Sequence, residues 1–219
     1  MGSAQKSTGI AIMTITVLGA TGHIGRRVVD ILLTQGYNVI AFCHGPNPFP
    51  FHNALKVVSG DVHRADDINH VLREADVVIC ALGSWHTPTQ DIVSSATGHL
   101  VKLMPELGIN RLVTLTGADA RMSGDHVTIF QQLLRPVLKQ VAPKILADSE
   151  KHLELLQQSS LAWTCLRSPV MRSFGSQGRF SIKTTPPPPW ATIHRQDVAT
   201  ALVQLAVLDD YIGEAVFIR

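Results

Sequence analysis

A glycine-rich stretch near the amino end, GATGHIG at positions 19–25, constrains the fold more than any other part of the chain. It follows an apolar run at 12–18 and precedes residues 26–33, whose apolar side chains recur at helical spacing. The stretch is therefore predicted to be a tight turn between a strand and a helix. There, glycine lets a phosphate approach the backbone, and the helix start supplies free N–H groups and the positive end of a dipole. This context makes the turn a candidate phosphate-binding loop.

Strand and helix patterns alternate along the rest of the chain. The order predicts a Rossmann-like α/β fold, doubly wound in three α/β/α layers around a mostly parallel sheet of about seven strands. Ligands of such sheets bind beyond the carboxyl ends of the strands, so the loops there are the candidate site. Strands are expected at 14–18, 37–42, 54–58, 76–82, 111–116, 161–166 and 215–218, and helices at 23–35, 66–74, 89–107, 126–140, 145–158 and 195–208.

Composition and charge exclude several classes of function. A net charge of +2 over 219 residues gives no electrostatic reason to expect binding to nucleic acid or to an acidic membrane surface. No apolar run is long enough to cross a membrane, and the polar first residues lack the apolar core of a signal peptide. Residues 1–12 are interpreted as a disordered lead or a cloning remnant, and residues 13–219 as a single nucleotide-binding domain of a cytoplasmic protein.

The three cysteines do not suggest a metal site or a disulfide. Cys43, Cys80 and Cys165 each lie in or at the end of an apolar, strand-like run, and none forms a CxxC or Cys/His ligand spacing. They are predicted to be buried free thiols in a reducing compartment, and no metal is expected.

The end of the second predicted strand bears on the choice of cofactor. An acidic residue there would bind the ribose 2′-hydroxyl of NAD, but the sequence has Phe42, Cys43 and His44. Arg26 or Arg27, just past the glycine turn, or His44 could approach a 2′-phosphate. The pattern favours NADP over NAD.

Four segments in a fixed order carry a resemblance to a known family. They are GATGHIGRRVV after the first strand, GDV at 60–62, ALG at 81–83 and SxLAWTxLR at 159–167. Together they resemble the atypical short-chain dehydrogenase/reductases, and within these the NmrA-like and flavin/biliverdin-reductase-like group, over residues 14–219. The resemblance implies cofactor contacts from Gly19, Ala20, Thr21, Gly22, His23, Ile24, Gly25, Arg26, His44, Asp61, Val62, Ala81, Leu82, Gly83, Thr116 and Lys144.

The resemblance also assigns roles to these positions. Asp61 and Val62 would flank the adenine, and residues 81–83 would line the ribose and pyrophosphate side. Thr116 matches the family's serine near the nicotinamide. Lys144, four residues before Asp148, looks like the lysine that hydrogen-bonds the nicotinamide ribose.

One departure from the family pattern affects the chemistry. Members that reduce carbonyls with a tyrosine carry it four residues before the lysine, where this chain has Gln140. A glutamine amide does not exchange a proton usefully near neutral pH. Tyr37 and Tyr211 are placed too far away to replace it. His126 is therefore counted with Thr116 and Lys144 among the candidate catalytic residues, and Asp119 is a second candidate proton donor.

Two functions fit these observations, and a third is weaker. The first is an NAD(P)H-dependent reductase that transfers hydride to a conjugated small-molecule acceptor such as a flavin or quinone, because the delocalised anion formed needs little acid catalysis. The second is a non-catalytic, NmrA-like regulator that binds NAD(P) and reports redox state to a protein partner. The third is an epimerase or dehydratase. A homodimer is a further alternative for the assembly.

The segment at 168–190 is rich in glycine, serine and proline. It is expected to cover the substrate side with Met171, Phe174, Phe180 and Trp190, although these side chains could instead pack the loop down. Trp85 and His86 are expected to border the same pocket. Asp197 is expected to favour the start of the last helix electrostatically.

Overall fold

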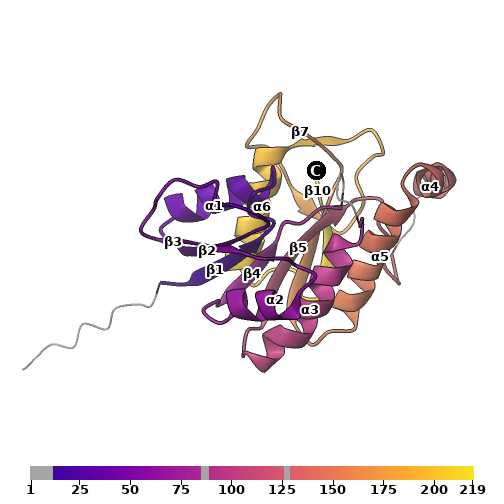
Figure 1. Ribbon diagram of the computed structural model, residues 1–219. Helices are drawn as coiled ribbons and strands as arrows, with labels where there is room; N and C mark the ends of the chain where they lie inside the picture. Colours follow the sequence, from indigo (N-terminus) through magenta and orange to yellow (C-terminus); the bar gives the residue numbers. More distant parts are fainter. Residues whose placement is uncertain (1–11, 85–88, 126–128) are drawn as a thin grey trace, which may run out of the picture.

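The computed structural model describes residues 12–84, 89–125 and 129–219 (Figure 1). Within these ranges the main strands and helices lie where the sequence predicts them, with shifts of a few residues at their ends. The strands are β1 (Thr14–Leu18), β2 (Asn38–Cys43), β3 (Leu55–Ser59), β4 (Val77–Cys80), β5 (Arg111–Gly117), β6 (Ala162–Ser168), β7 (Val170–Arg172), β8 (Ile182–Lys183), β9 (Thr192–His194) and β10 (Glu214–Ile218). The helices are α1 (Gly25–Thr34), α2 (Ala65–Leu72), α3 (Ile92–Glu106), α4 (Ile129–Val141), α5 (Pro143–Gln157) and α6 (Arg195–Val207).

The main sheet has eight strands in the order β3-β2-β1-β4-β5-β6-β10-β8. The first seven run parallel, and β8 joins the edge antiparallel to β10. The predicted doubly wound, mostly parallel sheet is therefore confirmed, and the expectation of about seven strands is corrected to eight. The added strand, β8, is only two residues long. It forms by pairing with β10, and this tertiary contact could not be predicted from the proline-rich sequence around it.

Helices cover both faces of this sheet, which makes the fold Rossmann-like and three-layered (Figure 1). One buried cluster joins the sheet to α1 and α6, and a second joins the opposite face to α2, α3 and α5. The central strands are buried on both faces, which explains why their sequences are nearly all apolar rather than alternating. Among the described residues, no helix combines the length and apolar character needed to cross a bilayer.

The predicted helix break near Pro143 is confirmed. Helix α4 ends at Val141, Ala142 leaves the helical conformation (φ −139°, ψ 54°), and Pro143 opens α5. Proline suits the first turn of a helix because it lacks the N–H that would be unsatisfied there. The two helices therefore have separate axes, and α4 projects from the body of the molecule in Figure 1.

The cysteines are buried free thiols, as predicted. Burial raises the pKa of Cys80 to about 12 and that of Cys165 to about 11. Both register with Thr114 on β5, which lies between their strands. Two strand spacings separate the two cysteines by about 10 Å, which is too far for a disulfide.

Residues 168–194, here called the cover segment, leave the carboxyl end of β6 and return to α6. Strands β7 and β9 pair within it as a small parallel sheet. Met171 and Phe180 are half-buried against the core, whereas Phe174 and Trp190 are exposed by 73% and 74%. The four side chains predicted to face the substrate therefore divide into two that pack the segment down and two that reach solvent.

Candidate functional site

The topological switch point lies between β1 and β4. From β1 the chain winds outward through β2 and β3, and from β4 it winds the other way through β5 and β6. The loops at 19–24 and 81–83 both leave from this point, and the N–H of Ala81 donates to the carbonyl of Leu18 at 3.0 Å. Crevices at such points are where nucleotides bind in open α/β sheets.

The glycine turn is packed so closely that a side chain at Gly19 or Gly25 would clash with backbone atoms. Gly19 has a φ of +73°, and a Cβ there would lie 2.9 Å from the carbonyl oxygen of Ala81. A Cβ at Gly25 would lie 2.1 Å from the carbonyl oxygen of Gly19. The turn is closed by the N–H of Gly22, which donates to Gly19 at 3.0 Å. Only glycine allows the turn to pack this closely on both α1 and the end of β4.

The start of α1 is left available for an anion. Ile24 at its N-cap makes no side-chain cap, and the first turn holds no acidic residue. A helix start without a side-chain cap, together with the positive end of the helix dipole, suits a pyrophosphate. Ala20 and Ile24 are buried in the core, so of the predicted contacts these two can act only through their backbone.

The two candidate arginines, Arg26 and Arg27, make different contacts. Arg26 is exposed, its Nε donates to the carbonyl of Thr21 at 2.9 Å, and its charge opposes the burial that raises the pKa of Cys43. Arg27 instead donates to the carbonyl of His23 at 2.5 Å. Of the two arginines, Arg26 is therefore the one whose charge is shown to act at the end of β2. Exposed His44 follows at the same strand end.

His63, which was not among the residues predicted from the sequence, joins the loop after β3 to the loop before α3. His63 Nδ1 lies 2.9 Å from Asp61 Oδ1, and its Nε2 lies 3.3 Å from Asp91 Oδ1. Hydrogen bonds from the backbone and ring of His63 lower the pKa of Asp61, and the bond to Asp61 raises the pKa of His63. Val62 is buried in the core. In the sequence, the feature that could have identified His63 is its position two residues after Asp61 of the GDV segment.

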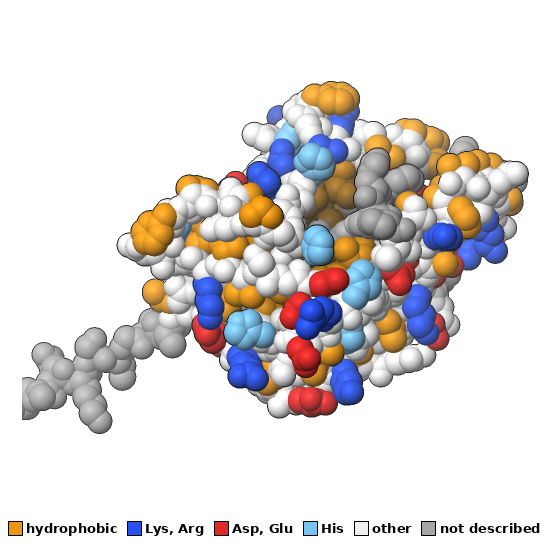
Figure 2. Space-filling model, viewed as in Figure 1, with side chains coloured by type: hydrophobic (Ala, Val, Ile, Leu, Met, Phe, Trp, Pro, Cys, Tyr) orange, Lys and Arg blue, Asp and Glu red, His pale blue; other side chains and the backbone are white. Residues whose placement is uncertain are grey.

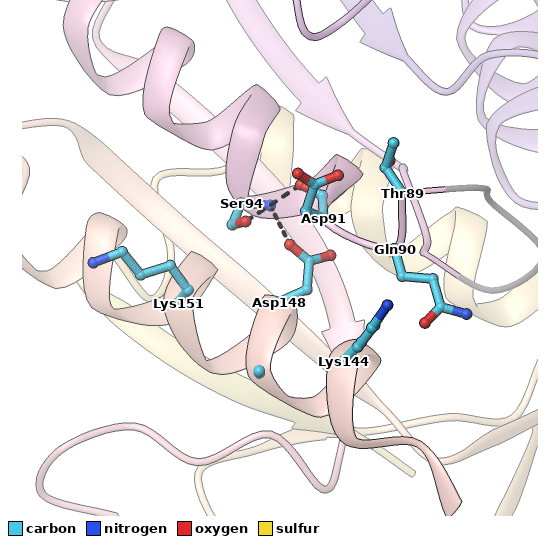
Figure 3. Close-up of a pocket in the computed structure, with 8 residues that line it drawn as sticks. Thr89, Gln90, Asp91, Ser94, Lys144, Asp148 and Lys151 are labelled. Atoms are coloured by element: carbon cyan, nitrogen blue, oxygen red, sulfur yellow. Dashed lines mark hydrogen bonds between the residues drawn. The ribbon is translucent and has the colours of Figure 1, made fainter.

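The part of the site expected to receive the nicotinamide is formed by the ends of β4 and β5 and the start of α5. Thr116 is nearly buried at the end of β5. Lys144 is exposed and, with Lys151, borders an open depression of about 350 Å³ between the starts of α3 and α5 (Figure 3). The depression is lined by Thr89, Gln90, Asp91, Ser94, Lys144, Ala147, Asp148 and Lys151.

Asp148 is the buried residue that holds this region together. Its carboxylate accepts hydrogen bonds from the N–H of Ser94 at 2.8 Å, the N–H of Val93 at 3.3 Å and the hydroxyl of Ser84. It therefore caps α3 from a neighbouring helix, a role that Asp91 at the N-cap position does not take. In contrast to α1, the start of α3 is already occupied by a carboxylate.

One turn further along α5, His152 is fully buried between α3 and the sheet. Thr97 Oγ1 donates to the carbonyl of Val93 at 2.7 Å, so it can only accept from His152 Nδ1, 2.7 Å away. The ring is therefore the Nδ1–H tautomer, and Nε2 accepts from Thr114 Oγ1 at 3.0 Å. Burial lowers the pKa of His152 to about 4, which keeps the ring neutral.

Arg167 of the SxLAWTxLR segment is a structural residue. It is buried, pairs with both oxygens of Asp125 at 2.5 and 2.9 Å, donates to the carbonyl of Ala215 at 2.7 Å and lies 4.0 Å from the centre of the Phe217 ring. The pair fixes the connection after β5 against β6 and β10.

Of the two candidate proton donors, Asp119 lies within the described residues and His126 does not. His126, Trp85 and His86 lie outside the described residues. Asp119 follows β5 in a turn, and desolvation raises the pKa of its carboxyl although the residue is largely exposed. The direction of that shift suits a proton donor.

Gln140, which occupies the position of the family's catalytic tyrosine, does not lie on the helical turn before Lys144. Gln140 is exposed on α4, and the break at Ala142 places it on a different helix from Lys144. Tyr37 directly precedes β2, and the carbonyl of Tyr211 accepts from Thr164 near the start of β6 at 2.9 Å. Both tyrosines therefore lie at the amino edge of the sheet, opposite the site.

Asp197 is nearly buried in the first turn of α6, where the sequence placed it. Its carboxylate also accepts from the N–H of Gly178 at 2.6 Å. It therefore ties the cover segment to α6 in addition to favouring the start of the helix.

Comparison with known proteins agrees with this geometry. The solved structures that match over 94% of this chain include an oxidoreductase from Lactococcus lactis (20% identity, 90% of that chain, TM-score 0.76) and a short-chain dehydrogenase/reductase from Veillonella parvula in complex with NADP (16% identity, 94% of that chain, TM-score 0.73). The chloroplastic divinyl chlorophyllide a 8-vinyl-reductase of Cucumis sativus is 26% identical over 176 residues, 74% of this chain. The chain spans 13% to 40% of the length of the curated relatives it matches.

A family model described as NAD(P)H-binding matches residues 19–209. The match begins at the first glycine of the turn and runs through α6, so it includes both loops of the switch point. The chain belongs to the NAD(P)H-binding family.

Proposed function

We propose that the protein is an NAD(P)H-dependent oxidoreductase of the atypical short-chain class that reduces a conjugated acceptor such as a flavin or quinone. A reduced nicotinamide, when bound, supplies two electrons and a proton as hydride. The remaining proton comes from water or from a side chain of the protein. Residues at the switch point fit the cofactor, because Gly19 and Gly25 keep the turn free of any Cβ and α1 begins uncapped.

The observation that carries this proposal is the structure around Lys144. Lys144 stands near the start of α5 with no tyrosine on the preceding turn, because the helix is broken at Ala142. Carbonyl reduction needs a placed acid, whereas a conjugated acceptor spreads its charge and accepts a proton from water or a weak acid. Asp119, with its raised pKa, is the described side chain suited to that role. Similarity to a relative whose name describes the reduction of a vinyl group on chlorophyllide also supports a conjugated acceptor.

Each part of the site has a stated task in this proposal. The turn at 19–25 and the backbone at 81–83 would bind the pyrophosphate and ribose, and Asp61 and Val62 would border the adenine. Lys144 would hydrogen-bond the nicotinamide ribose, and Thr116 would lie beside the ring. These assignments follow the family resemblance and the carboxyl-edge placement of every described residue among them.

The cofactor preference is proposed to be NADP, because Arg26 lies near the end of β2. Titration calorimetry with NADP⁺, NADPH, NAD⁺ and NADH tests this directly. Replacing Arg26 by alanine should weaken NADP(H) about tenfold or more and leave NAD(H) unchanged. Arg27→Ala is the matched control, because Arg27 is turned toward His23. Equal weakening of both cofactors by Arg26→Ala would contradict the assignment.

A redox-sensing regulator is the competing function, and the missing tyrosine favours it as well. The two proposals are separated by turnover. Oxidation of NADPH with any of a panel of flavins, quinones and tetrapyrroles at a useful rate supports the reductase. If no acceptor is reduced, and oxidised and reduced cofactors bind with clearly different affinities, the regulator is supported instead.

A further inference from the structure

The cover segment carries positive charge and has no acidic residue of its own. Between Ser168 and His194 the sequence holds Arg172, Arg179 and Lys183 and no aspartate or glutamate. Figure 2 shows Lys and Arg side chains gathered with hydrophobic ones at the upper end of the molecule, where Figure 1 labels β7. Below this group the visible face is hollowed. The segment expected to meet the acceptor is therefore cationic as well as apolar.

Arg172 differs from three other buried or partly buried arginines, Arg111, Arg135 and Arg167. Arg111 donates to main-chain carbonyls and Thr164, Arg135 pairs with Glu150, and Arg167 pairs with Asp125. Among residues 12–84, 89–125 and 129–219, no carboxylate pairs with Arg172. Its Nε is buried without a hydrogen-bond partner, as are those of Arg111 and Arg167, but the other guanidinium nitrogens of Arg111 and Arg167 donate to acceptors of the protein. A buried donor without an acceptor is costly unless a ligand supplies one.

The surroundings of Arg172 keep its guanidinium in place. Its Cζ lies 5.7 Å from the centre of the exposed Phe174 ring and about 3.5 Å from where a Cβ of Gly175 would stand. The turn beyond it is anchored by Arg195, which donates to Ser173 Oγ at 2.6 Å, and by the bond between Gly178 and Asp197. A planar cation and an aromatic face are thus presented together on a fixed turn.

Arg172 lies within reach of the nicotinamide side. Ser168 registers with Gly117, the residue after Thr116, and its carbonyl accepts from the N–H of Ala118 at 2.8 Å. Arg172 is the fourth residue after Ser168, so their Cα atoms lie within about 14 Å of each other. That distance matches an acceptor whose ring lies at the nicotinamide while a substituent extends toward the cover segment.

We propose that Arg172 binds an anionic group of the acceptor, so that the substrate is a conjugated ring bearing a phosphate or carboxylate rather than a neutral one. The inference rests on the proposed reductase function and names its substrate class. Guanidinium binds either anion through two parallel N–H donors. The Phe174 ring, 73% exposed, offers a stacking surface for the conjugated part of the same molecule.

Two matched pairs of acceptors test the proposal and distinguish the anions. FMN and riboflavin share one ring system and differ by the phosphate, and anthraquinone-2-carboxylate and anthraquinone differ by the carboxylate. Binding to the protein with NADP⁺ is measured by flavin fluorescence or by calorimetry, and turnover is measured with NADPH. The anionic member of at least one pair should bind about tenfold or more tightly, and the pair that shows the difference identifies the anion.

In Arg172→Gln, the affinity for that anionic acceptor should fall to the affinity for its neutral partner. The affinity for the neutral acceptor should stay unchanged. Arg179→Gln is the matched control, because it removes one exposed charge from the same segment. Thermal unfolding of both variants shows whether the fold is retained, and Arg172→Lys, which keeps the charge but not the planar fork, should restore only part of the preference.

Three results would overturn the proposal. They are equal affinity within both pairs, an equal effect of Arg179→Gln, and an equal loss of the neutral acceptor in Arg172→Gln. If the anionic acceptors bind preferentially but none is reduced, the reductase function fails while the anion site stands. If all acceptors are reduced with equal KM values, the reductase function stands and the anion site fails.

Discussion

The carboxylate of Asp148 on α5 accepts a 2.8 Å hydrogen bond from the backbone N–H of Ser94 in the first turn of α3. This bond joins two neighbouring helices that both line the depression beside Lys144 (Figure 3). Lys144 lies one turn earlier on α5, and Ser84, just past the predicted ribose loop, donates to the same carboxylate. The position of the proposed ribose ligand is therefore coupled to the loop after β4.

Replacing Asp148 by alanine should destabilise the protein by about 2 kcal/mol or more. The change leaves the Ser84 hydroxyl and two N–H groups of α3 without their acceptor in a buried place. Urea unfolding measures the loss, and calorimetry should show weaker binding of both NADP and NAD. Asp91→Ala is the control, because exposed Asp91 makes no side-chain cap to the same helix and should cost about 0.5 kcal/mol or less. Equal stability of Asp148→Ala and the wild type would contradict the capping role.

Gly19→Ala should cost more than Gly36→Ala. Both glycines have positive φ, +73° and +85°, so both variants carry a similar conformational penalty of about 1–2 kcal/mol. Only at Gly19 does the new Cβ meet a backbone carbonyl, that of Ala81, whereas Gly36 faces open space. The extra loss at Gly19 should be about 1 kcal/mol or more, measured by chemical unfolding. Cofactor binding should fall in Gly19→Ala alone, and similar losses in both variants would mean that the turn is not packed on β4.

Lys144→Gln should weaken NADP and NAD by the same factor, about tenfold, because the nicotinamide ribose is common to both. Lys151→Gln is the matched control, because Lys151 borders the same depression two turns further along α5. Calorimetric titration of the two variants with both cofactors provides the measurement. A loss confined to NADP would place Lys144 near the 2′-phosphate instead, and an equal loss in Lys151→Gln would indicate a general effect of charge.

Protein stability should fall as the pH is lowered from about 6.5 to about 4, in part through His152. The folded-state pKa is lowered to about 4 by burial, while an unfolded histidine titrates near 6.5. In this window the unfolded chain binds a proton that the folded protein does not, so the free energy of unfolding decreases with falling pH by about 3 kcal/mol over the whole range.

His152→Gln should make the pH dependence of stability flatter over this window, although it lowers stability at pH 7 by breaking the bonds to Thr97 and Thr114. Urea unfolding at several pH values between 4 and 7 gives both quantities. The difference between variant and wild type removes the contributions of other groups, including exposed His63, whose raised pKa acts in the opposite direction. Parallel curves for the two proteins would rule out His152 as the source.

The sequence by itself determined the order of strands and helices, the glycine turn, the break before Pro143 and the buried thiols. These are local properties: hydrophobic period, the steric freedom of glycine, and the missing N–H of proline each act within a few residues. Only the tertiary structure decided what depends on contacts between distant segments. It decided that the charge of Arg26 acts on Cys43 at the end of β2, that β8 extends the sheet, that Asp148 caps α3 and that Arg172 has no carboxylate partner among the described residues. The reason is that a side chain's partners are fixed by which elements pack together, and neither residue type nor spacing encodes that packing.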